Sequence, residues 1–81
     1  MARKRIHIVY PENLVKEPVL FRMARQFDVM PNIRRAKVSD TMGEIVVELE
    51  GDEENIRQGI QYLKDAGVEV EPLEEEFLEE Q

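Results

Sequence analysis

The sequence contains no cysteine and a single histidine, and these two shortages exclude several kinds of site. Without cysteine the chain forms no disulfide, no thiolate metal site and no cysteine-held iron–sulfur cluster. One histidine alone does not build a zinc site. We therefore predict that the protein carries no metal and no other cofactor.

Long apolar runs are also missing. The first ten residues, MARKRIHIVY, begin basic but contain no apolar run that would form the centre of a signal peptide. No window approaches the ~20 apolar residues that a membrane-spanning helix needs. We expect no membrane insertion and a cytoplasmic location.

Catalytic motifs are absent from the sequence as well. The four glycines, at positions 43, 51, 59 and 67, are isolated from one another and form no phosphate-binding loop. Ser39 and His7 show no arrangement typical of a catalytic triad, and the acidic residues are predicted to lie on solvated strand and helix faces. We predict that the protein is not an enzyme.

The charge is unevenly distributed along the chain. The net charge is −7, but residues 1–37 hold nine Lys and Arg against three Asp and Glu, whereas residues 38–81 hold two against fifteen. In a small interleaved fold the two halves lie side by side and their fields largely cancel. Because the overall acidity opposes attraction to phosphates, nucleic-acid binding is not expected.

Hydrophobic periodicity predicts six elements in one small domain. Period-2 alternation indicates the strands, and a 3.6-residue period indicates the helices, the first of which has Pro18 in its opening turn. The predicted elements are strand 5–10, helix 17–27, strand 32–39, strand 44–50, a helix from an Asp52 N-cap to Gly67, and strand 68–72. This order predicts an α+β ferredoxin-like βαββαβ split sandwich, a four-stranded antiparallel sheet with two helices on one face.

The outward face of the predicted sheet alternates acidic and basic residues. In this fold the strands lie in the spatial order fourth, first, third, second, which places opposite charges on neighbouring strands. No aromatic residue falls at an outward position, so the face lacks the rings on which RNA-binding sheets stack bases. His7 is interpreted as a surface histidine among acids, with a general base or metal ligand as the less favoured alternative.

The stretch DVMPNIRRA departs from good strand chemistry. Pro31 is expected to stop the preceding helix. Ala36 and Val38 share a face of the following strand, whereas Ile33 has the opposite parity. Either a β-bulge concentrates irregular backbone at Asn32, or Ile33 points away from the core as a dimer contact.

The last nine residues, LEEEFLEEQ, form an acidic tail, residues 73–81, beyond a domain of residues 1–72. As a helix this tail would offer Leu73 and Phe77 to a partner. Acidic ends of such composition are more often frayed than docked, and both possibilities stay open.

Three blocks of the sequence, EPVLFRMARQFDV, NIRRAKV and GEIVVELEGDEENIRQGIQYLKDAGVEVE, together resemble the NIL domain. The resemblance covers residues 4–72. NIL domains are small ferredoxin-like regulatory modules related to ACT-type amino-acid-sensing domains. They occur at the C-terminus of the ATPase subunit of methionine importers, where the domain pairs with its twin and binds methionine, and also fused to ferredoxin modules.

The resemblance therefore implies a homodimer that binds a small amino acid, methionine or a related sulfur amino acid. It also implies a protein partner in sulfur amino-acid transport or metabolism. The basic sequence NIRRA is more similar to the ferredoxin-linked branch than to the transporter branch, which leaves the identity of the amino acid open.

By the same resemblance, the ligand site surrounds the start of the second strand and includes Asn32 and Ile33, with Met30 and Arg34 as neighbours. The Asn32 amide has donor and acceptor groups for a zwitterionic head, and Arg34 is able to take a carboxylate bidentately. Alternatively, Asn32 satisfies the preceding turn and Arg34 protects a strand edge. The second hypothesis is a ligand-free adaptor that docks a transporter ATPase or a ferredoxin-type partner through this edge or the acidic tail.

Overall fold

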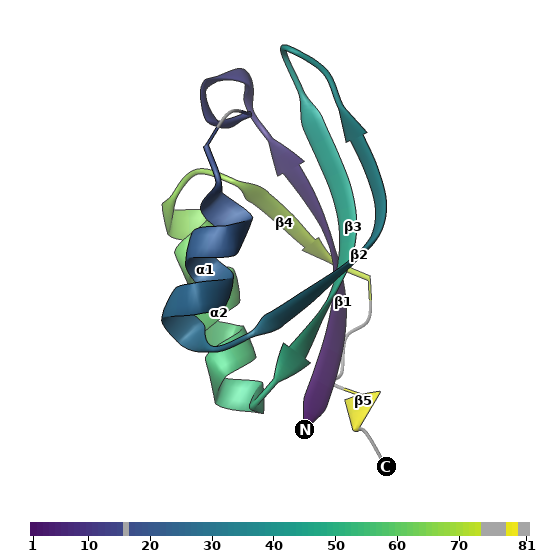
Figure 1. Ribbon diagram of the computed structural model, residues 1–81, viewed down its shortest axis with the longest axis vertical. Helices are drawn as coiled ribbons and strands as arrows, with labels where there is room; N and C mark the ends of the chain where they lie inside the picture. The colour runs from purple at the N-terminus through teal and green to yellow at the C-terminus, as the bar shows by residue number, and fades with distance from the viewer. Residues whose placement is uncertain (16, 74–77, 80–81) are drawn as a thin grey trace.

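Two helices cover one face of an antiparallel sheet, and the other face of the sheet is open (Figure 1). The computed structural model describes residues 1–15, 17–73 and 78–79. The elements are β1 (Ala2–Tyr10), the 3₁₀ helix η1 (Glu12–Leu14), α1 (Val19–Phe27), β2 (Met30–Val38), β3 (Gly43–Gly51), α2 (Glu53–Asp65), β4 (Glu69–Pro72) and β5 (Leu78–Glu79). The predicted α+β ferredoxin-like order is confirmed.

The sheet order is β2-β3-β1-β4, as the sequence predicts. β1 and β3 pair over their whole lengths, with Ile6 opposite Val47 and Ile8 opposite Ile45. β5 adds a short pairing to the N-terminal end of β1, which the sequence analysis did not predict. From the sequence, a helical tail would offer Leu73 and Phe77 to a partner. Phe77 lies outside the described residues.

The core lies between the sheet and the helices. Alternate residues of β1 and β3 point into it, because successive side chains of a strand face opposite sides. The largest fully buried apolar side chains come from both layers: Ile6, Ile8, Met23, Val47, Leu49, Ile56 and Leu63. Phe27 and Tyr62 close the helix layer with an edge-to-face contact at a centroid distance of 5.7 Å.

The first helix is shorter than predicted at its N-terminus. The prediction begins it at Glu17, but Pro18 has ψ 55°, outside the helical range, so the helix begins at Val19. Its end is set by Asp28, which adopts the left-handed conformation with φ 55°, and the N–H of Val29 donates to the carbonyl oxygen of Ala24. The helix therefore ends before Pro31 takes effect.

The second strand begins at Met30, two residues earlier than predicted. Met30 pairs with Glu50 and Pro31 with Leu49. β2 is the edge strand of the sheet, where a proline without an N–H is tolerated. The predicted start at Asn32 depends on Pro31 as the residue that stops the preceding helix.

The second helix follows the prediction closely. It begins directly after Asp52, although the Asp52 side chain makes no capping hydrogen bond. It is followed by Gly67, whose φ of +101° is left-handed and suits a residue without a Cβ. Among the described residues, no helix has the length and apolar character to cross a membrane.

Candidate functional site

A β-bulge in β2 determines which face of the sheet each residue of the predicted site occupies. Ile33 pairs with Val47 but Arg35 pairs with Val46, so Arg34 is the extra residue. Of the two alternatives, the bulge is confirmed, and it lies at Arg34 rather than at Asn32. It puts Ile33 on the helix side of the sheet.

Asn32 and Arg34 both lie next to Glu48, an outward residue of β3. Asn32 lies opposite Glu48 in the β2–β3 register. The Arg34 Nη2 atom donates to Glu48 Oε1 over 3.3 Å. The bulge thus gives the edge strand a guanidinium group that reaches back over the sheet, next to the amide of the preceding outward residue.

Two more arginines share the same carboxylate. Arg5 Nη2 donates to Glu48 Oε2 over 3.0 Å, and Arg3 Nη1 lies 3.7 Å from Glu48 Oε1. Glu48 is only 2% exposed. The expectation that the strand acids are solvated is therefore wrong for Glu48, because three long side chains from β1 and β2 cover it.

The three arginines keep the Glu48 carboxyl ionised. Burial alone raises its pKa, but hydrogen bonds from Arg5 and Arg34 and the charges of Arg34 and Arg3 outweigh burial and lower the pKa below its ordinary value of 4.5. The carboxylate in turn fixes the positions of the guanidinium groups. We name Arg3, Arg5, Arg34 and Glu48 the arginine cluster.

His7 lies among acids on the same open face, as predicted. Its Nε2 atom is 2.8 Å from Glu44 Oε1, and its Nδ1 atom is 4.0 Å from Glu71 Oε2. These contacts join β1 to both neighbouring strands. They confirm the alternation of acid and base across the sheet.

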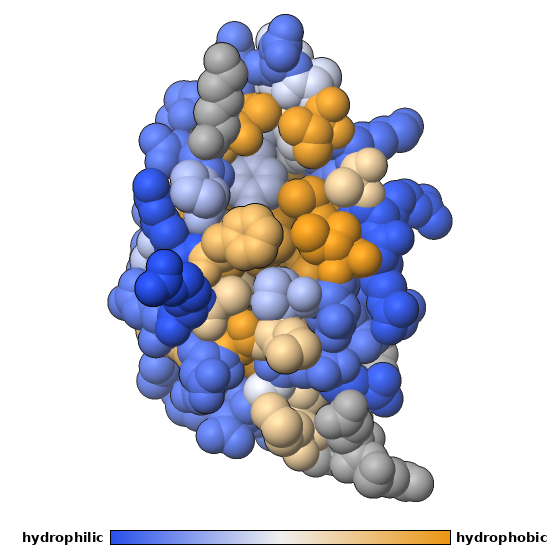
Figure 2. Space-filling view, viewed as in Figure 1, coloured by the Kyte–Doolittle hydropathy of each residue, from blue (hydrophilic) through white to orange (hydrophobic). Residues whose placement is uncertain are grey.

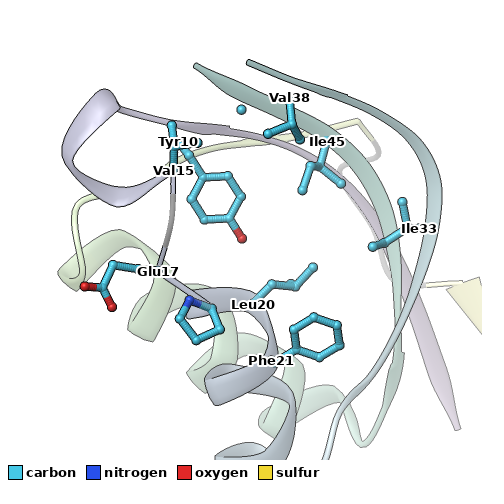
Figure 3. A pocket seen from close by; sticks show the side chains of 10 residues that line it. Tyr10, Val15, Glu17, Leu20, Phe21, Ile33, Val38 and Ile45 are labelled. Carbon is cyan, nitrogen blue, oxygen red and sulfur yellow. The ribbon is translucent and has the colours of Figure 1, made fainter. Parts of the chain in front are cut away.

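The helix side of β2 carries an apolar groove instead. A cavity of about 160 Å³ opens between α1 and the β2–β3 hairpin. It is lined by Tyr10, Val15, Glu17, Pro18, Leu20, Phe21, Ile33, Val38, Gly43 and Ile45 (Figure 3). Phe21, Ile33 and Val38 are each at least half exposed, and apolar side chains form the centre of the surface in Figure 2.

Tyr10 forms the inner wall of this groove. Burial raises the pKa of the Tyr10 hydroxyl, and a hydrogen bond with the backbone of Leu20 offsets part of the rise. A second hollow of about 470 Å³ lies nearby at the start of β2, where Phe21 and Met30 are among its lining residues. Phe21 borders both hollows. Sequence reasoning missed it, although an aromatic residue outside the buried stripe of a helix is a usable signal.

The structure therefore divides the four predicted site residues between two faces. Met30, Asn32 and Arg34 belong to the open side or the exposed edge, whereas Ile33 lines the groove on the helix side. Within one copy of the chain, Asn32 and Ile33 do not point to a common space.

Comparison with known proteins places this arrangement in a family. The NIL domain family model matches residues 4–72. The chain belongs to the NIL domain family. The resemblance seen in the sequence is confirmed, and the ferredoxin-like sheet with its two helices is the framework of this NIL domain.

Its curated relatives are methionine import ATP-binding proteins. MetN 1 of Listeria monocytogenes is 40% identical over 62 residues, which cover 72% of this chain and 18% of the relative. MetN of Streptococcus agalactiae is 33% identical over 79 residues, which cover 93% of this chain and 22% of the relative. The NIL domain chain thus spans about a fifth of the length of the curated relatives it matches.

Solved structures share the fold at lower identity. The C-terminal domain of an ABC transporter ATP-binding protein from Enterococcus faecalis superposes with a TM-score of 0.77 at 22% identity, covering 90% of this chain and 86% of that one. The de novo designed protein Foldit4 gives a TM-score of 0.60 at 16% identity, covering 99% and 98%. At these identities the likeness supports the architecture alone.

Proposed function

We propose that this NIL domain is a small-molecule-binding regulatory module that senses methionine or a related sulfur amino acid. The curated relatives are named methionine import ATP-binding proteins. The resemblance to NIL domains, which are regulatory modules, supports the regulatory role. The observation that carries the proposal is the bulge at Arg34, which sets a guanidinium group beside Asn32 on the exposed edge strand.

The chemistry of these groups fits an amino-acid ligand. The Arg34 guanidinium donates to the ligand carboxylate, while the Asn32 amide donates and accepts at the zwitterionic head. Met30 is an exposed apolar residue at the same end of β2, and it contacts the ligand's side chain. No chemical transformation is part of this role, so the module is not an enzyme.

We further propose that the module works as a homodimer. Ile33 faces away from Asn32 within one copy, so a ligand that contacts both residues lies between two copies. The exposed edge of β2 and the apolar side chains beside it supply the surface for such pairing.

The proposed organisation is a domain of residues 1–72 with an acidic tail, residues 73–81. We place the module in the cytoplasm, where it acts on a protein partner in sulfur amino-acid transport or metabolism. The chain matches about a fifth of the length of its relatives, and ATP binding is named of those relatives as whole proteins.

The alternative function is a ligand-free adaptor that docks a transporter ATPase or a ferredoxin-type protein. The exposure of Phe21, Ile33 and Val38 beside the free edge of β2 favours this alternative, since exposed apolar patches mark interaction surfaces.

Calorimetric titration with methionine and homocysteine separates the two functions. We expect heat of binding with the wild-type chain, at least tenfold weaker binding in Asn32→Ala and Arg34→Gln, and unchanged binding in Arg22→Gln, which removes the same charge from α1. If neither amino acid gives heat of binding with the wild-type chain, the sensing proposal is overturned. The adaptor is supported if the wild-type chain captures a protein partner, Ile33→Asp does not, and neither amino acid gives heat of binding.

A further inference from the structure

The arginine cluster on the open face of the sheet holds more positive than negative charge among the described residues. Three guanidinium groups lie within 4.0 Å of a single carboxylate, that of Glu48. Glu50 is opposite Arg3 in the register but forms no ion pair with these arginines among the described residues. Counting Glu48 and Glu50, the cluster keeps an excess of one positive charge among the described residues.

Hydrogen-bond donors are in excess as well. Three guanidinium groups carry about fifteen N–H donors, whereas one carboxylate has about four acceptor positions. The Nε atoms of Arg3 and Arg5 are buried and have no hydrogen-bond partner within the described part of the chain. Buried donors without acceptors are rare in folded proteins, and an ordered water or an ion that is not part of the chain is able to satisfy them.

The Nε atoms of Arg3 and Arg5 are buried, but the three arginine side chains as a whole stay partly open to solvent. The Arg3, Arg5 and Arg34 side chains are 32%, 43% and 54% exposed, whereas Glu48 beneath them is 2% exposed. An approaching anion therefore meets guanidinium groups and not the carboxylate. Because Glu48 already fixes these groups, little side-chain entropy is lost when an anion binds.

More positive charge lies along the same face. Arg35 and Lys37, together with Glu44 and Val46, line a hollow of about 110 Å³ on the outward side of β2 and β3. Glu44 is already engaged with His7 through the contact of 2.8 Å. In a chain with a net charge of −7, this strip is a local exception that attracts anions.

We propose that the arginine cluster is an oxyanion-binding site, in which Arg3 and Arg5 join Arg34 in holding a carboxylate, with Glu48 as the residue that positions them. The inference rests on the proposed function, since Arg34 belongs to both, and it identifies the ligand's carboxylate as the group recognised. An inorganic oxyanion such as sulfate offers the same chemistry. The experiments below distinguish an amino-acid carboxylate from an inorganic oxyanion.

The first test uses sulfate and the full chain. The arginine Nε–Hε signals are followed by NMR while sodium sulfate is added, against sodium chloride at equal ionic strength. We expect saturable shifts for Arg3, Arg5 and Arg34, with Arg22 and Arg25 unchanged. Shifts that match chloride, or that are equal for all arginines, overturn the site.

The second test uses variants and a ligand analogue that has no carboxylate. Arg3→Gln and Arg5→Gln are expected to weaken sulfate binding about tenfold, whereas Arg22→Gln leaves it unchanged. Arg3→Gln removes only the longest of the three ion pairs, so it keeps the test valid if Arg5→Gln does not fold. Methioninol, which lacks the carboxylate, is expected to bind at least tenfold more weakly than methionine.

The outcomes distinguish this inference from the proposed function. If sulfate binds at the cluster while methionine and homocysteine give no heat, the oxyanion site stands and sulfur amino-acid sensing fails. If methionine binds equally to wild type, Arg3→Gln and Arg5→Gln but at least tenfold more weakly to Arg34→Gln, sensing stands and the oxyanion site is wrong.

Discussion

Arg5 and Glu48 are directly opposite each other on β1 and β3, and Arg5 Nη2 donates to Glu48 Oε2 over 3.0 Å. The residues are 43 positions apart in the sequence. The contact therefore ties the first strand to the middle of the chain, in a place where the carboxylate has lost nearly all of its access to water.

Stability should fall in acid because of this carboxylate. The pKa of Glu48 is lowered in the folded state, so its stabilising contribution is complete above about pH 4.5 and is lost as the pH falls through the folded pKa. Glu48→Gln is expected to lower the free energy of unfolding at pH 7 by about 2 kcal/mol and to flatten the acid side of the stability curve. Urea denaturation from pH 7 to pH 3 measures both effects.

The matched control is Glu53→Gln, which removes an exposed acid that pairs with Arg57 on α2. This change should cost less than about 1 kcal/mol and leave the acid dependence as it is in the wild type. Parallel acid curves for wild type and Glu48→Gln would contradict the assignment.

Gly59 makes room for Met23 between the two helices. A Cβ at position 59 would lie 2.6 Å from the Met23 Sδ atom, and Met23 is fully buried. Alanine in place of a helical glycine ordinarily adds about 1 kcal/mol, but overpacking costs about 1–3 kcal/mol. We expect Gly59→Ala to leave the free energy of unfolding unchanged or to lower it by up to about 2 kcal/mol.

The double variant tests this explanation. In a Met23→Ala background the space next to position 59 is empty, so Gly59→Ala should become stabilising by about 1 kcal/mol. Chemical denaturation of the four chains gives the coupling. Additive effects of the two changes would show that the helices do not compete for this space.

The sheet and the core were predictable because each depends on local pattern. The alternation of Ile6 and Ile8, and of Val47 and Leu49, fixes which faces are buried, and their strands pair in the register this alternation requires. The parity of Ile33 left two alternatives, a bulge in β2 or an outward Ile33, and the bulge is present, at Arg34.

The arginine cluster was not predictable in the same way. Glu48 has the outward parity of an exposed acid, and its burial depends on long side chains that arrive from two other strands. The spacing of residues in the sequence does not indicate which long side chains from other strands will cover Glu48. The position of the bulge at Arg34 and the exposure of Phe21 depend in the same way on how β2 and α1 are placed.

Asp28 ends α1 in a conformation that favours glycine. Its φ of 55° and ψ of 50° lie in the left-handed region, where a residue with a Cβ is strained. Asp28→Gly should raise the free energy of unfolding by up to about 1 kcal/mol, and Asp28→Val should lower it by at least as much. Thermal melts of the two variants check the prediction, and equal melting temperatures would refute it.

Ile33 provides the sharpest test of the proposed homodimer. Its side chain is half exposed in one copy of the chain and lines the apolar groove with Phe21 and Val38. Pairing of two copies along β2 removes this apolar surface from water, at a gain of about 25 cal/mol per Å² buried. Sedimentation of the wild type should therefore give a dimer, and Ile33→Asp should give a monomer.

The exposed Leu73 lies outside the groove, so Leu73→Asp should remain dimeric. Neither substitution should disrupt the fold itself, because neither side chain belongs to the buried core. A wild-type monomer, or an Ile33→Asp dimer as tight as the Leu73→Asp dimer, would remove the β2 groove from the interface.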